Sequence, residues 1–251
     1  MRKTLLALAV FALLAAGCGD DDDGDTATGA TTTAAGAATS TTEEPSDTTS
    51  TTAAPGQLPG ERMDIFPYED AALAVVGVEA GDVLNVRSAP GTSAEVVAEL
   101  EPLADDLTAT GHNRQIGGQT IWVEVDTGAQ QGWVNGAFVA QLGGTDDATS
   151  RLYPDVADRP VAETLQQLAE LVAADAAGEA EPAPRVVVVD GPTVADLGEV
   201  VVDVLGYPDD SVYGERLHLF AEEEGSESFR LRTVEATTLC RRGIDAEGRC
   251  T

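Results

Sequence analysis

The sequence has few positive charges, since 14 lysines and arginines stand against 44 aspartates and glutamates in 251 residues, and no lysine follows Lys3. Proteins that bind nucleic acid need clustered cations to displace the counterions of the phosphates, and no such cluster is present. The formal charge of −30 also argues against a protein that lies flat on an anionic membrane surface. We therefore expect no nucleic-acid partner.

Groups suited to catalysis are scarce as well. His112 and His218 are the two histidines, and the sequence contains no H-E-x-x-H, G-x-S-x-G or S-x-x-K motif and no Gly-rich phosphate loop. We expect a protein that is not an enzyme and that holds no cofactor and no metal. The remaining alternative is a hydrolase that uses two carboxylates, because 44 acidic residues make accidental pairs unavoidable.

Residues 1–17 have the plan of a secretory signal peptide. Two cations precede an apolar run from Leu5 to Ala16, which is too short to span a hydrocarbon core of about 30 Å. The small residues before Cys18 resemble a lipobox, at which bacteria attach diacylglycerol and cleave the signal, although Ala15 stands where leucine is usual. We expect an extracytoplasmic lipoprotein, anchored to the bacterial cell membrane by lipid on Cys18. The alternative is an ordinary cleaved signal followed by a free thiol.

Residues 18–66 are dominated by Asp, Thr, Ala, Gly and Ser, with hardly any large aliphatic residue before residue 60. Such a segment cannot bury enough apolar surface to offset the entropy lost on ordering. We predict a disordered N-terminal tether that lifts the folded part of the chain away from the membrane.

The pattern changes between residues 67 and 143 to short β-rich runs separated by Gly, Pro, Asn and Asp. Several of these runs alternate apolar and polar residues, as strands with one buried face do. The expected strands cover residues 73–78, 83–87, 95–100, 106–111, 120–125, 132–134 and 138–142. Short strands at this spacing predict a small closed or half-closed barrel.

Three blocks make this prediction more specific: LNVRSAPGTSAEVVAEL at 84–100, WVEV at 122–125 and GWVNGAFV at 132–139. Their order and spacing resemble the bacterial SH3-like family, although Ala89 stands where that family usually has glycine. The resemblance implies an SH3-like small barrel. Members of the family are often attached to wall hydrolases or surface proteins, and some bind peptidoglycan peptides, so it also implies recognition of the cell wall.

The signature residues of these blocks have expected structural roles. We expect Asn85 and Arg87 to fix the following turn through bonds to the backbone. Gly132 should let the chain bend tightly before Trp133, which would fill a small core. The alternative for Asn85, Arg87 and the two tryptophans is direct contact with a ligand, for which an exposed edge of Trp122 is a candidate.

The other candidate ligand contacts are His112, Asn113 and Arg114, which we place in a long loop at 111–120. Residues 71–142 contain nine acids and two arginines, so binding to a wall would need local hydrogen bonds or the amines of wall peptides. The alternative is that this loop is merely solvated.

A polar break at 143–150 separates this domain from residues 151–251, which predict an α+β domain with one helix on a curved antiparallel sheet. Apolar residues at helical spacing predict the helix over 160–177, with Asp158 as cap and Gly178 at its end. The expected strands cover residues 185–190, 198–206, 215–223 and 228–239, the last two as a hairpin. The arrangement superficially resembles cystatin-like and nuclear-transport-factor-like cones, which often enclose a pocket.

Cys240 and Cys250 are separated by nine residues near the C-terminus. Outside the cytoplasm a close pair predicts a disulfide. The alternative is a metal or redox pair, but the spacing matches neither C-x-x-C nor a zinc pattern.

These observations together predict a membrane-anchored, non-catalytic lipoprotein whose SH3-like domain binds peptidoglycan or another component of the cell envelope, such as a surface protein. The alternative is a sensor or accessory lipoprotein whose C-terminal domain binds a small molecule or a protein. A deep pocket behind the C-terminal sheet would favour that alternative, and a filled core would count against it.

Overall fold

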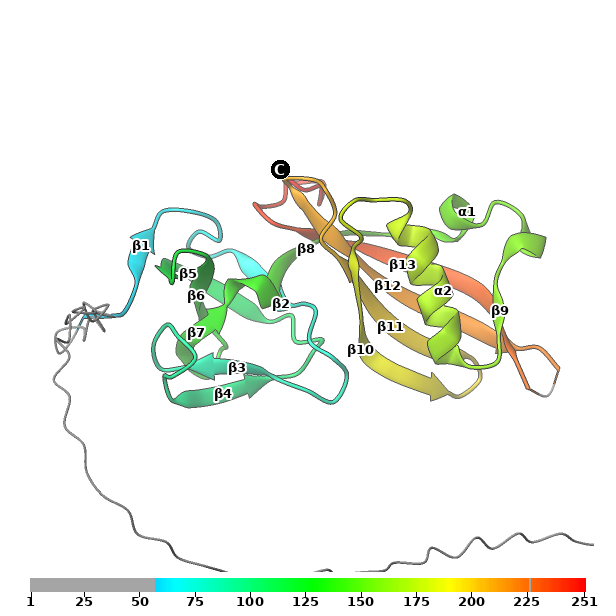
Figure 1. The fold of residues 1–251 in the computed structure, drawn as a ribbon, viewed down its shortest axis with the longest axis horizontal. Helices are drawn as coiled ribbons and strands as arrows, with labels where there is room; N and C mark the ends of the chain where they lie inside the picture. The colour runs from blue at the N-terminus through cyan, green and yellow to red at the C-terminus, as the bar shows by residue number, and fades with distance from the viewer. Residues whose placement is uncertain (1–56, 226) are drawn as a thin grey trace, which may run out of the picture. The chain divides into compact units, whose positions relative to one another are not determined.

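The computed structural model describes residues 57–225 and 227–251 (Figure 1). Cys18, the predicted signal peptide and the predicted tether up to residue 56 lie outside the described residues. The described chain is mostly antiparallel β-strand with few helices, as the sequence patterns predict. Within this part of the chain, no helix is both long and apolar enough to cross a bilayer.

Short strands fill the region that resembles the SH3-like family. They are β1 (Glu61–Met63), β2 (Ala72–Val75), β3 (Leu84–Arg87), β4 (Val96–Leu100), β5 (Leu107–Ile116), β6 (Thr120–Asp126) and β7 (Gln131–Asn135). All except β1 coincide with expected strands. β1 lies at the end of the segment that was predicted to be a disordered tether. It is a strand because it pairs with β5, a contact that the local composition does not indicate. Buried valines of β3, β6 and β7 form the core of this region.

Strand β8 (Val139–Asp147) belongs to both halves of the structure. Its first residues pair with β2, and its later residues pair with β13 (Phe229–Cys240). The order of the described strands runs from β10 (Arg185–Val194) at one edge to β4 at the other, so the sheet is not closed. The expected closed barrel is wrong, because β8 continues into the C-terminal sheet. For the same reason the predicted polar break at 143–150 is strand as far as Asp147.

Arg87 fixes the turn after β3 as predicted, whereas Gly132 has a different role. The Arg87 guanidinium donates a hydrogen bond of 2.7 Å to the carbonyl of Ala94. The Asn85 side chain makes no such bond within the described residues. A Cβ atom on Gly132 would lie 2.5 Å from Cγ1 of Val86 and 3.0 Å from the Arg87 carbonyl oxygen. Glycine is therefore needed because β7 passes close to β3, and not because the chain bends there.

The two tryptophans lie on the outer face of the β6–β7 hairpin. Val123 faces Val134 in the antiparallel register, and side chains alternate along each strand, so Trp122 and Trp133 point away from the valine core. Both are still buried, with exposed fractions of 4% and 2%. The β3–β4 loop runs beside Trp122, since Thr92 lines the same hollow. The prediction that Trp133 is a large buried side chain is confirmed, but it lies on the opposite face of β7 from the valine cluster.

The C-terminal half consists of one main helix on an antiparallel sheet. Its strands are β10, β11 (Gly198–Leu205), β12 (Val212–Glu223) and β13, with β9 (Val161–Ala162) beside β13. Helix α2 (Leu165–Ala177) lies across one face of this sheet (Figure 1). The shorter helices are η1 (Gly136–Phe138), α1 (Thr149–Leu152) and η2 (Val156–Asp158).

Helix α2 begins later than its apolar stripe predicts. Val161 pairs with Arg230 of β13 as part of β9, so the chain is extended there and cannot begin a helix at residue 160. The cap is Thr164, whose hydroxyl accepts a hydrogen bond of 3.1 Å from the amide of Gln167, and not Asp158. The helix ends at Gly178 as predicted, with a positive φ of 60°.

The space between α2 and the sheet is filled with side chains. On the helix, Leu168, Ala169 and Val172 have no exposed surface, and they face equally buried residues of β11 and β12 such as Val202 and Leu217. Burial of this apolar area is the main stabilising contribution to the C-terminal half. The packing leaves no room for the deep pocket that a cystatin-like cone would place behind the sheet.

A buried ion pair connects the two halves. Asp203 of β11 has no exposed surface, and its carboxylate accepts two hydrogen bonds from the Arg216 guanidinium, at 2.7 and 2.9 Å. The same carboxylate accepts a bond of 2.8 Å from the amide of Gly77, and Arg216 donates a bond of 2.8 Å to the carbonyl of Val75. Each charge has several hydrogen-bond partners, and together they tie the C-terminal sheet to the segment around β2.

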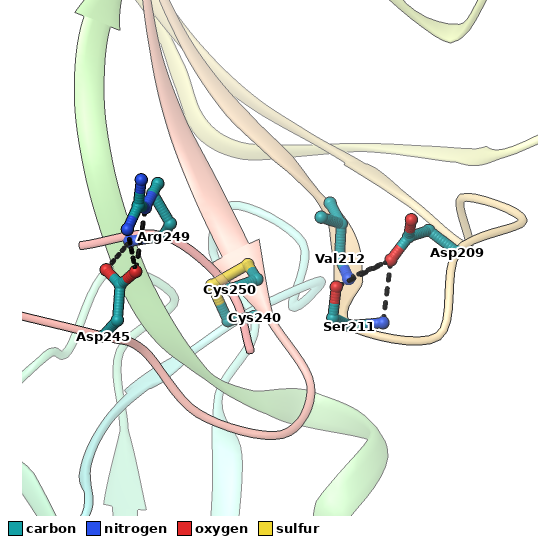
Figure 2. The surroundings of a disulfide bond; sticks show 7 residues. All are labelled: Asp209, Ser211, Val212, Cys240, Asp245, Arg249 and Cys250. Carbon is teal, nitrogen blue, oxygen red and sulfur yellow. Dashed lines mark hydrogen bonds and ion pairs between the residues drawn. A yellow bond between two sulfur atoms is a disulfide. The ribbon is translucent and has the colours of Figure 1, made fainter. Parts of the chain in front are cut away.

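Cys240 and Cys250 form a disulfide, as predicted (Figure 2). Cys240 is fully buried at the end of β13, and the bond holds the last residues of the chain against β8, where the amide of Gly144 donates to the carbonyl of Gly248 at 2.8 Å. Closing so short a loop contributes somewhat under about 3 kcal/mol, chiefly by restricting the unfolded chain.

Exposed aspartates organise turns in this C-terminal half (Figure 2). Backbone bonds from Val212 and Ser211 lower the pKa of Asp209, and bonds from the backbone and side chain of Arg249 lower the pKa of Asp245. The side chain and amide of Thr149 lower the pKa of Asp147 in the same way.

These lowered pKa values predict sensitivity to acid. As the pH falls below the ordinary carboxyl value of 3.8, the unfolded chain takes up protons at these sites before the folded chain does, so acid favours unfolding. Above that value the contribution is fully present. We expect the melting temperature to decrease as the pH is lowered below about 4. In the variant Asp209→Ala this decrease should be less steep. Thermal melts between pH 2 and 6, with Asp190→Ala as an exposed control, test this. An unchanged slope in the Asp209 variant would contradict it.

Candidate functional site

The predicted ligand contacts His112, Asn113 and Arg114 lie in strand β5 and not in a loop. The actual turn covers only residues 117–119, because β5 and β6 pair as far as Ile116 and Thr120. Alternation along β5 places Asn113 on the opposite face from His112 and Arg114. The structure therefore does not bring them together as one binding surface.

Each of these three side chains is already engaged. The exposed His112 ring lies 2.6 Å from the carboxylate of Glu124. Arg114 donates a bond of 3.1 Å to the carbonyl of Gly60 and faces Trp122 across the β5–β6 ladder.

Asn113 holds a neighbouring segment in place. It is 1% exposed, and its amide nitrogen donates to the carbonyls of Ile65 and Pro67, at 2.8 and 3.0 Å. Its own amide oxygen is buried and has no hydrogen-bond partner among the described residues. The geometry makes Asn113 an anchor for the chain that precedes β2, and it has no surface with which to contact a ligand directly.

Three of the signature residues, Asn85, Arg87 and Trp122, line one hollow, which we call the signature groove. It has a volume of about 430 Å³ and is lined by Glu79, Asp82, Asn85, Arg87, Trp122 and Arg185, among others. Trp122 contributes the small part of its surface that remains exposed. The side chains of Asn85 and Trp122 thus share a site although 36 positions separate them in the sequence.

Charges of both signs surround the signature groove. Arg87 and Arg185 already donate to the carbonyls of Ala94 and Gly77, at 2.7 and 3.3 Å. Glu79 and Asp82 are exposed, and no ion pair engages either carboxylate among the described residues. The groove therefore offers acceptors for an amine, together with polar side chains for hydrogen bonds.

A second hollow of about 530 Å³ lies beside the segment that Asn113 anchors, and we call it the Arg241 groove. Its walls are mainly apolar and come from Ile65, Phe66, Pro67, Ile121, Val139 and Tyr213. Sequence reasoning missed it, because its wall combines at least five stretches that lie far apart in the chain. The tandem Arg241-Arg242 beside Cys240 was the one local signal of a cationic site.

Neither groove has the composition of a metal centre. Within residues 57–225 and 227–251, no group of three or more histidine, cysteine, aspartate or glutamate side chains is placed to hold a metal ion. Comparisons of the chain with protein-family models, with curated proteins and with solved structures found no match.

Proposed function

We propose that this protein is an extracytoplasmic lipoprotein, anchored through lipid on Cys18, whose SH3-like region binds peptides of the cell wall in the signature groove without catalysis. The observation that carries the proposal is that Asn85 and Arg87 of the first sequence block line one groove together with Trp122 of the second. The resemblance to the bacterial SH3-like family supplies the class of ligand.

The electrostatics of the groove indicate how an acidic protein would bind such a peptide. Wall peptides carry free amines as well as carboxylates. Glu79 and Asp82 are available to an amine, and Asn85 and Thr92 are available for hydrogen bonds. Binding by these local contacts needs no overall attraction between the protein and the wall, which the charge of −30 would oppose.

The filled core of the C-terminal half favours this proposal over a sensor that encloses a small molecule there. Leu168, Val202 and Leu217 have no exposed surface in the layer between α2 and the sheet. A ligand in that layer would have to displace packed side chains, at a cost comparable to creating a cavity of the same size.

Retention on purified peptidoglycan tests the proposal. We expect the chain from residue 19 onward to be retained at low and moderate salt. The double variant Glu79→Gln/Asp82→Asn should bind roughly fivefold more weakly, because each exposed ion pair contributes up to about 1 kcal/mol. Chemical acetylation of the wall amines should weaken wild-type binding by a similar factor.

The matched control is Glu222→Gln/Glu223→Gln, which removes the same number of exposed acids from the end of β12. It should bind as the wild type does. If the wild type is retained neither at low nor at moderate salt, the proposal is wrong. An equal loss in both double variants would show that net charge, and not the groove, controls retention.

A further inference from the structure

We propose that the Arg241 groove binds a small aliphatic carboxylate, such as a medium-chain fatty acid. This site is distinct from the signature groove, and its assignment does not depend on wall binding. The volume of about 530 Å³ lies in the range of small-molecule sites, which are typically concave, mainly apolar and supplied with a few polar groups.

Charge complementarity selects an anion. Arg241 is the one charged residue that lines this groove in the described part of the chain, which is notable in a protein with 44 acidic residues. The neighbouring Arg242 is paired with Asp210 at 2.7 Å, whereas no carboxylate lies within ion-pair distance of Arg241 in residues 57–225 and 227–251. A bound carboxylate would supply the partner that Arg241 lacks.

The Arg241 side chain is held in position to meet such a group. Its amide donates to the carbonyl of Ser211 at 2.8 Å, and the preceding Cys240 is fixed by the disulfide. The guanidinium carbon lies 4.6 Å from the centre of the Tyr213 ring. The Tyr213 hydroxyl in turn donates a bond of 3.0 Å to the carbonyl of Ala137 on the opposite wall. Arg241 is exposed, and its stacking on Tyr213 gives the guanidinium a preferred position beside the groove.

The backbone groups of the lining residues favour a ligand with a hydrocarbon chain over a peptide. The carbonyls of Ile65 and Pro67 are occupied by Asn113, and the carbonyl of Ala137 is occupied by Tyr213. Ile121 pairs with Gln115 in the β5–β6 ladder. The polar side chains that line the groove are Gln119, Thr120 and Asn135, and the Asn135 oxygen already accepts from the Ala137 amide. A peptide would therefore find partners for only some of its amide groups, and burying amides without partners is costly. A hydrocarbon chain makes no such demand.

Titration calorimetry with decanoate, below the concentration at which it self-associates, tests the proposal. We expect decanoate to bind the chain from residue 19 onward. Arg241→Gln should weaken this binding about tenfold or more, because a charge-assisted contact is lost. Arg242→Gln, the matched control, should leave it unchanged. 1-Decanol should bind weakly and equally to the wild type and the Arg241 variant.

A second variant tests the apolar part of the site. Ala137→Trp places a large side chain in the groove from the exposed η1 turn, so it should abolish decanoate binding while Arg241 remains. Equal affinity of decanoate for wild type and Arg241→Gln would overturn the proposal. Tighter binding of the peptide acetyl-trileucine than of decanoate, or binding to phosphatidylglycerol vesicles without binding of free decanoate, would also overturn it.

Discussion

Replacing Asp203 by asparagine should lower the free energy of unfolding by about 3–5 kcal/mol, because the Arg216 charge would then be buried without a counter-charge. Asp203 is fully buried, and its carboxylate meets both Arg216 and the amide of Gly77. Asparagine has the same shape but can accept through only one oxygen, and its amide group would face donors. Urea unfolding, followed by circular dichroism, measures the loss.

The chain offers a matched control in the Asp210–Arg242 pair, whose side chains are 76% and 57% exposed. Asp210→Asn should change the free energy of unfolding by less than about 1 kcal/mol, because water screens an exposed pair. A joint replacement of Asp203 and Arg216 by leucine and methionine should recover part of the loss, since it removes both charges at once. A loss below 1 kcal/mol in Asp203→Asn would contradict the buried pair.

Trp133→Ala should destabilise the protein by about 3–5 kcal/mol, as truncation of large buried aromatic side chains generally does. Trp133 is 2% exposed and pairs with Arg87, where β7 meets β3. Its loss would leave a cavity on the face of β7 that is opposite the valine core. Trp122 is then the single remaining tryptophan, and its fluorescence reports unfolding in denaturant.

The conservative variant Trp133→Phe should cost considerably less, because the phenyl ring fills most of the same space. Val156→Ala, at a side chain that is 63% exposed, should have an effect within about 0.5 kcal/mol. If Trp133→Ala unfolds at the same denaturant concentration as the wild type, the outer face is not packed as described.

Local pattern predicted the strands well, because alternation of apolar and polar residues is a short-range property. The same alternation carried the signal that Trp133 points outward, since it is the neighbour of Val134 and cannot share its face. We assigned Trp133 to the core from its size alone. The later start of α2 was hidden because the pairing of Val161 with Arg230 spans 69 positions.

The candidate sites depended even more on long-range contacts. His112, Asn113 and Arg114 are adjacent in sequence, which suggested a shared surface, but a strand sends neighbours to opposite faces. The structure makes Asn113 a support for the chain at Ile65 and Pro67, a contact across 46 positions or more. Arg241 and Arg242 look alike in the sequence, but Arg242 pairs with Asp210 whereas Arg241 stacks on Tyr213.

The dual pairing of β8 determines where the chain can be divided into fragments. Ala140 hydrogen-bonds within the ladder to β2, while Thr145 lies opposite Thr237 of β13. A cut anywhere between these two positions would strip one sheet of a partner and leave a long hydrophobic edge open to other chains. Fragments of the chain that begin or end there should therefore aggregate when they are expressed alone.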